Sequence, residues 1–149
     1  MAGSASIVAG GKASGANKWQ SRVALAGRLL LAILFLLSGI GKLATPGMTL
    51  AYIRSVGLPV APLALAASAL VEIAGGTALI LGYRSRFTAA ILVAFTLLAA
   101  LIFHSNFADQ NQMIHFLKNV SIAGGLLQVV AFGGGGLSID ARARRERFH

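Results

Sequence analysis

The chain has 149 residues, of which 56% are hydrophobic and only 11% are charged. Soluble domains carry about 25% charged residues because water must solvate their surface, so we expect the apolar segments of this chain to face lipid. The length suits one compact bundle and leaves no room for a second soluble domain. The chain has no cysteine, which excludes disulfide exchange, thiolate catalysis, iron–sulfur ligation and covalent attachment of c-type haem.

The formal net charge is +9. The basic residues flank apolar segments and form no separate basic domain, so we predict contact with a lipid bilayer and no nucleic-acid partner. Residues 1–21, rich in Gly, Ala and Ser at their start, predict a flexible N-terminal tail. Residues 22–136 predict one transmembrane domain, and residues 137–149 predict a basic C-terminal tail.

Four apolar segments have about the 20 residues that a helix needs to cross a hydrocarbon core. They span residues 23–43, 61–81, 87–103 and 116–132. Strands would need polar alternation, which is absent, and a lone sheet in lipid would leave its edges unpaired. The sequence therefore predicts an all-α fold, a polytopic four-helix bundle in the membrane.

The distribution of Lys and Arg predicts the orientation of this bundle. Nine of these residues flank the two termini or lie in the loop between the second and third segments, against three on the other side. The positive-inside rule therefore predicts a multi-pass protein of the inner (plasma) membrane with both termini cytoplasmic. We expect the C-terminal tail to lie at the anionic membrane surface.

Turns and glycines suggest further local structure. The loop 44–62 predicts a short interfacial helix between two turns, with Tyr52 near the lipid headgroups. The run 133–136 predicts the end of the fourth helix and a flexible joint. VEIAGG in the second segment returns as VSIAGG in the fourth, which leaves an internal duplication open and predicts that both helices pack centrally through paired glycines.

Ionisable groups inside the membrane are costly and need a partner or a function. Glu72 lies about midway along the second segment, and Arg28 lies about one and a half turns into the first. A long Arg28 side chain could bridge the remaining depth. Three interpretations stay open: a structural Arg–Glu pair, an Arg28 that extends to the membrane surface, or a Glu72 that accepts protons or anchors a polar ligand.

A second polar group is expected where the first and third segments end and the fourth begins, at Lys42, His104, Lys118 and Asn119. The connecting loop adds Asn106, Asp109, Gln110, Asn111 and His115. This group is either an ordinary hydrated rim or the mouth of a pocket for a quinone-like or small anionic ligand, with His104 as proton carrier. Because the histidines match neither a haem site nor a specific metal pattern, we predict no metal.

The ordered segments GRLLLAILFLLSGIGKL, EIAGGTALILGYRSR, FH, FLKNVSIAGGLL and LSID resemble the DoxX family of bacterial and archaeal four-helix membrane proteins, over roughly residues 22–140. The resemblance implies membrane subunits linked to quinol oxidase or thiosulfate:quinone oxidoreductase activity, or partners of soluble redox or sulfur-handling enzymes in oxidative-stress defence. By position it marks as ligand-binding candidates Arg28, Lys42, Glu72, His104, Lys118 and Asn119.

Three functions follow as hypotheses. The first is a quinone-interacting redox subunit, in which Glu72 and His104 are the candidate catalytic residues and electrons come from a partner. The second is a non-enzymatic scaffold that recruits a soluble enzyme through its tails. The third is a small-molecule carrier, which a narrow four-helix bundle would form as a homo-oligomer. The sequence contains no cofactor motif, so quinone is the one cofactor considered, and catalytic turnover is left open.

Overall fold

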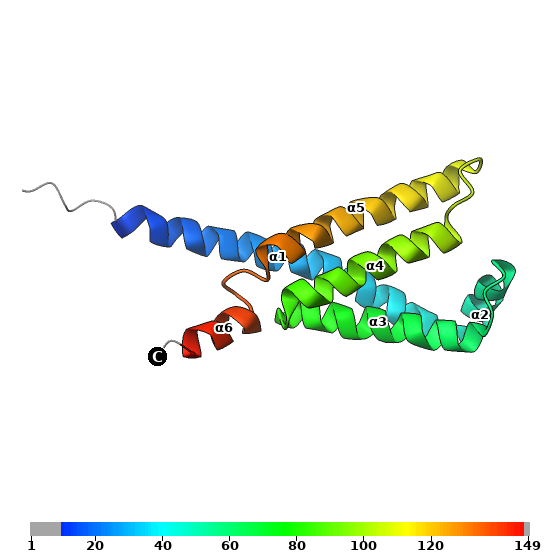
Figure 1. The fold of residues 1–149 in the computed structure, drawn as a ribbon, viewed down its shortest axis with the longest axis horizontal. Coiled ribbons are helices and arrows are strands. Elements are labelled where there is room, and N and C mark those ends of the chain that lie inside the picture. The colour runs from blue at the N-terminus through cyan, green and yellow to red at the C-terminus, as the bar shows by residue number, and fades with distance from the viewer. Residues whose placement is uncertain (1–9, 148–149) are drawn as a thin grey trace, which may run out of the picture.

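The computed structural model describes residues 10–147, and within them it consists of six helices (Figure 1). The helices are α1 (Gly10–Ala44), α2 (Pro46–Ser55), α3 (Ala61–Leu81), α4 (Ser85–Phe103), α5 (Gln110–Phe132) and α6 (Ile139–Glu146). Residues 18–44 of α1 and the whole of α3, α4 and α5 are long and apolar enough to cross a membrane. The predicted all-α membrane bundle is therefore confirmed.

Two helices begin earlier than the sequence predicted. Helix α1 starts at Gly10, so residues 10–17, which we expected in a flexible tail, are helical, while residues 1–9 lie outside the described residues. Helix α5 starts at Gln110 because the carboxylate of Asp109 caps it by accepting hydrogen bonds from the backbone N–H groups of Asn111 and Gln112. His115, expected in a loop, consequently lies in the second turn of a helix.

The bundle consists of two antiparallel helix pairs, α1 with α3 and α4 with α5. The pairs lie together where the described chain begins and ends, and they diverge toward the opposite end, where α2 lies (Figure 1). We call these the basic end and the α2 end. The predicted short helix in the first loop is confirmed as α2, and its Tyr52 hydroxyl donates a hydrogen bond to the Phe103 carbonyl at 3.2 Å.

The main apolar core joins all four spans. Its buried side chains are Ala32, Phe35, Leu79, Ala89, Leu92, Leu126 and Val129. A smaller cluster of Ile53, Ala61 and Leu65 holds α2 against α3. Helix α3 contacts α1, α2 and α4 and is central, as predicted, whereas α5 is the least buried of the four spans. The prediction that the fourth segment is equally central was wrong.

The paired glycines explain this difference. A Cβ atom on Gly76 would lie 2.9 Å from Leu36 Cγ and 3.1 Å from the Ala32 carbonyl oxygen, so this glycine lets α1 approach α3. A Cβ atom on Gly75 would lie 2.7 Å from Leu92 Cδ2, so this glycine admits α4. In α5, a Cβ on Gly124 would meet no atom within 4 Å. The repeated motif therefore permits close packing of neighbouring helices in α3, and it does so only in part in α5.

We predict that Gly76→Ala destabilises the bundle by about 1–3 kcal/mol, the usual cost of overpacking. Gly124→Ala, the matched change in α5, should leave stability unchanged or raise it by about 1 kcal/mol through helix propensity. Thermal unfolding of both variants in the same detergent measures the difference. Equal loss of stability in the two variants would contradict the packing described here.

Candidate functional site

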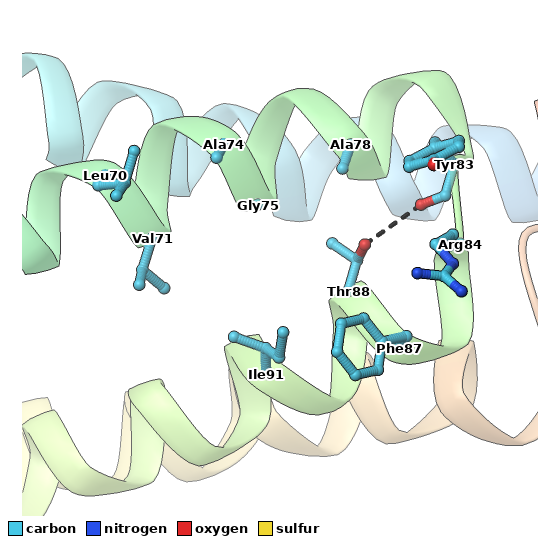
Figure 2. A pocket seen from close by; sticks show the side chains of 10 residues that line it. All are labelled: Leu70, Val71, Ala74, Gly75, Ala78, Tyr83, Arg84, Phe87, Thr88 and Ile91. Atoms are coloured by element: carbon cyan, nitrogen blue, oxygen red, sulfur yellow. Dashed lines mark hydrogen bonds between the residues drawn. The ribbon is translucent and has the colours of Figure 1, made fainter.

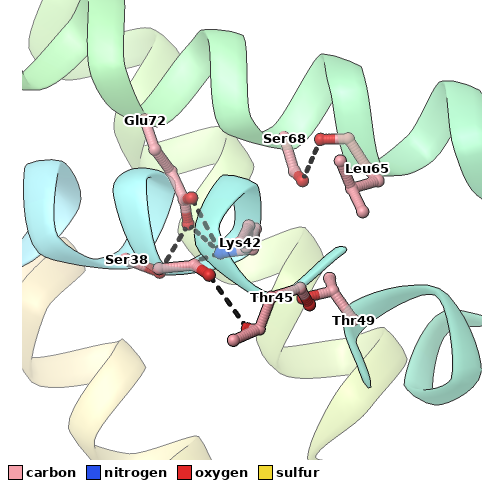
Figure 3. Close-up of polar contacts among 8 residues, drawn as sticks. Ser38, Lys42, Thr45, Thr49, Leu65, Ser68 and Glu72 are labelled. Atoms are coloured by element: carbon pink, nitrogen blue, oxygen red, sulfur yellow. Dashed lines mark hydrogen bonds and ion pairs between the residues drawn. The ribbon is translucent and has the colours of Figure 1, made fainter. Parts of the chain in front are cut away.

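A buried polar cluster joins α1 to α3 within the membrane-spanning region (Figure 3). The ammonium nitrogen of Lys42 lies 2.7 Å from each carboxylate oxygen of Glu72 and donates to the Ser38 hydroxyl at 2.8 Å. Ser38 donates in turn to Glu72 Oε1 at 3.0 Å. The Glu72 side chain is 6% exposed and that of Lys42 is 25% exposed, so this ion pair is largely removed from solvent.

The sequence places these groups together by helical spacing. Ser38 and Lys42 are four residues apart and so share one face of α1, and Gly39 lies between them. A Cβ atom on Gly39 would lie 2.7 Å from Ile73 Cγ1 and 3.2 Å from Glu72 Cβ, so this glycine brings the two backbones close together. The three protons of the Lys42 ammonium group have three acceptors. The network is therefore fully hydrogen-bonded, and it holds α1 against α3.

The partner of Glu72 is therefore Lys42, and the Arg28–Glu72 pair that the sequence left open as one alternative does not form. Arg28 lies at the basic end, where its Nη2 donates to the Leu137 carbonyl at 2.5 Å. Its side chain is 1% exposed and packs against Gly82, where any Cβ atom would clash with Nη1. An arginine near the end of a span thus binds the segment that follows α5, rather than reaching toward the middle of the membrane.

Asp140, which the sequence analysis missed, completes this attachment. Its carboxylate accepts hydrogen bonds of 2.7 Å from the backbone N–H groups of Arg84 and Ser85, and so caps the start of α4. Its own N–H donates to the Gly82 carbonyl at 3.1 Å. Partial burial opposes ionisation of Asp140, but the hydrogen bonds from Ser85 and Arg84 and the charge of Arg144 prevail and lower its pKa. The carboxylate is therefore ionised at neutral pH.

The polar group expected at the α2 end is only partly assembled. His104 Nδ1 lies 2.9 Å from Gln112 Oε1, and its ring stacks on His115 with centroids 5.1 Å apart. Asn119 donates to the His115 carbonyl of its own helix, and Lys118 is exposed. Lys42 belongs to the separate cluster with Glu72. Across residues 10–147 no group of three or more His, Cys, Asp or Glu side chains could hold a metal ion.

The third feature is a groove of about 390 Å³ between α3 and α4 (Figure 2). Its lining residues are Leu70, Val71, Ala74, Gly75, Ala78, Tyr83, Arg84, Phe87, Thr88 and Ile91. The walls are apolar, and the polar groups gather where the groove meets the basic end. There the Arg84 guanidinium lies 5.8 Å from the centre of the Phe87 ring, and the Thr88 hydroxyl donates to the Tyr83 carbonyl. The groove thus suits an amphiphile with one polar end.

The Lys42–Glu72 pair yields a test of its structural role. We predict that Lys42→Met destabilises the bundle by about 3 kcal/mol or more, because it leaves a buried carboxylate without a counter-charge. Glu72→Gln should cost less, since the better exposed Lys42 side chain can extend toward the membrane surface. The double variant Lys42→Met/Glu72→Gln should recover much of the loss, because no unpaired carboxylate remains.

Unfolding in detergent of the four proteins forms a double-mutant cycle that measures this coupling. Strictly additive losses would show that the two side chains do not stabilise each other.

Comparison with known proteins identifies the family. The DoxX family model matches residues 23–105. The inner membrane protein YqjF of Escherichia coli is 40% identical over 118 residues, which cover 78% of this chain and 88% of that protein. The inner membrane protein YphA of the same organism is 32% identical over 123 residues, with 79% and 88% covered. No solved structure matches the chain. The chain belongs to the DoxX family of membrane proteins.

Proposed function

We propose that this DoxX-family protein is a quinone-interacting membrane subunit, and that the groove between α3 and α4 holds the quinone. The groove is the observation that carries the proposal. Its volume of about 390 Å³ falls within the range of ligand sites, which is about 300–1,000 Å³. Its apolar walls suit an isoprenoid chain, and its position between two spans gives a membrane-dissolved ligand direct access.

The polar end of the groove supplies hydrogen-bond donors for a quinone head. The Tyr83 hydroxyl and the Arg84 guanidinium both donate, and the carbonyl oxygens of a quinone only accept. Thr88 is less suited, because its hydroxyl proton already goes to the Tyr83 carbonyl. This location differs from the one that we expected at His104 and Glu72, whose hydrogen-bond partners are protein groups.

The chain offers a quinone no redox group of its own. It contains no cysteine, and its sequence has no haem, flavin or iron–sulfur motif. Electrons would therefore come from a soluble redox or sulfur-handling enzyme. The exposed arginines of α6, Arg142, Arg144 and Arg145, offer such an enzyme a basic surface. In this proposal the chain binds and positions the quinone, and the partner performs the electron transfer.

We expect Ala74→Phe, which fills the groove with a ring, to weaken quinone binding about tenfold or more, equivalent to 1.4 kcal/mol or more. Ala26→Phe makes the same change on an exposed part of α1 outside the groove and should bind normally. Small molecules extracted from the purified protein would be identified by mass spectrometry, and binding of added ubiquinone and menaquinone would be titrated for each variant.

Two further variants test the alternative location. If Glu72→Gln and His104→Ala weaken binding while Ala74→Phe does not, the ligand lies at the α2 end and the groove assignment is wrong. If wild-type protein neither retains nor binds a quinone, the redox proposal fails. The non-enzymatic scaffold would then be the better hypothesis, with α6 as its contact surface.

In the orientation that we propose, the protein lies in the inner membrane and both of its termini are in the cytoplasm. Because the chain has no native cysteine, single cysteines report accessibility cleanly. We expect Asn106→Cys, at the α2 end, to react with an impermeant maleimide in spheroplasts. Arg147→Cys, beyond α6, should react only after the membrane is permeabilised. The reverse pattern would place the termini on the other side.

A further inference from the structure

A second cavity, of about 570 Å³, lies at the basic end, away from the α3–α4 groove. Helix α1 forms one wall through Gln20, Ser21 and Ala24. The opposite wall consists of Phe132, Gly133, Gly135 and Gly136, and we call the run 133–136 the glycine loop. No acidic side chain lines this cavity. Its polar lining consists of an amide, a hydroxyl and backbone groups, which is a neutral surface able to donate hydrogen bonds.

The glycine loop is packed and is not the flexible joint that we expected. Gly133 and Gly135 have φ angles of +79° and +74°, which L side chains rarely adopt. A Cβ atom on Gly134 would lie 2.4 Å from Ser85 Oγ, and one on Gly135 would lie 2.8 Å from Ala24 Cβ. The backbone of the loop therefore lies directly on α1 and on the start of α4.

Three arginines from three different helices surround this loop. Arg28 of α1 has its Nη1 3.2 Å from where a Gly134 Cβ would be, and Arg86 of α4 has its Nε 3.5 Å from the same position on Gly133. Arg145 of α6 donates to the Gly136 carbonyl at 3.2 Å. The carboxylate of Asp140 attracts the charge of Arg28 but is held by the backbone of α4. Positive charge at the loop is thus in excess.

The buried positive charge of Arg28 is not explained by helix packing alone. Its side chain is 1% exposed, yet Nε and Nη1 have no hydrogen-bond partner among the described residues. A buried charged donor without an acceptor costs more than one that is hydrogen-bonded. Arg28 lies one helical turn beyond Ala24, on the same face of α1, so its guanidinium lies directly behind the loop that lines the cavity.

We propose that the cavity beneath the glycine loop binds a phosphate group. A phosphate there would bring negative charge close to two arginines that adjoin lining residues, Arg86 at Gly133 and Arg145 at Gly136, and its oxygens would accept hydrogen bonds from the loop backbone and from Gln20. Opposite charges attract over several ångströms without direct contact. The phosphate belongs either to a phospholipid headgroup, because the cavity lies at an end of the spans, or to a free phosphorylated solute.

The test compares two double variants that remove the same charge. Arg86→Gln/Arg145→Gln removes the two exposed arginines at the loop. Arg142→Gln/Arg147→Gln removes Arg142, which pairs with Glu146, and Arg147, which caps the end of α6. Full-length protein in maltoside detergent is titrated with inorganic phosphate, with dihexanoyl phosphatidylglycerol and, as a neutral control, with dihexanoylglycerol. Calorimetry gives the affinity, and fluorescence of Trp19, the only tryptophan and the neighbour of Gln20, reports on the cavity.

We expect saturable binding that Arg86→Gln/Arg145→Gln weakens about tenfold or more, since two positive charges beside the cavity are lost, with the other double variant within about threefold of wild type. Saturation by inorganic phosphate supports a free solute, and saturation by phosphatidylglycerol alone supports a headgroup. Equal weakening in both double variants, or no saturable binding of either phosphate compound, overturns the proposal. Quinone binding should be unaffected throughout, which separates this site from the groove.

Discussion

A hydrocarbon interior holds no water to solvate a charge, and this constraint governs the arrangement of the polar residues in this protein. Each ionised side chain within a span must find its partner in the protein or reach the membrane surface. Lys42 and Glu72 meet the constraint with each other, through two contacts of 2.7 Å and a shared serine. Arg28 meets it only in part, with one carbonyl acceptor, although Asp140 also attracts its charge. The local structure around each of these groups therefore reflects how completely its charge is paired or hydrogen-bonded.

The same solvent removes the usual reason for helices to associate, because lipid tails are as apolar as leucine side chains. Close approach of backbones must supply the attraction instead, and glycines permit it. Gly39 and Gly76 bring α1 and α3 together, and this close contact is what allows the short Ser38 side chain to reach Glu72. Packing and charge pairing therefore act together in this part of the bundle. The glycines bring the helices close, and the ion pair fixes their register.

The sequence predicted the architecture because hydrophobic length is a strong signal in membrane proteins. It predicted the spans to within a few residues, apart from α1 and the start of α5, where the cap formed by Asp109 was overlooked. It could not identify the partner of Glu72, since depth alone allowed Arg28 as well as Lys42. The signal that would have decided the matter is the spacing of Ser38 and Lys42, which places two donors on one face of α1. Asp140 was missed because its partners are backbone N–H groups 55 and 56 residues away.

The two ends of the bundle differ in a way that bears on function. In the α1–α3 cluster, Lys42, Glu72 and Ser38 hydrogen-bond one another, and at the α2 end His104 Nδ1 lies 2.9 Å from Gln112 Oε1. A ligand there would have to break existing bonds before it could form its own. At the basic end lie the polar end of the groove and the cavity beside the glycine loop, and Arg28 Nε and Nη1 have no acceptor among residues 10–147. Binding there replaces no protein–protein hydrogen bond of Arg28 or Tyr83. The basic end is therefore the better candidate for ligand binding. The reason is that it retains hydrogen-bond donors that are unpaired among the described residues, and not that it holds more polar residues.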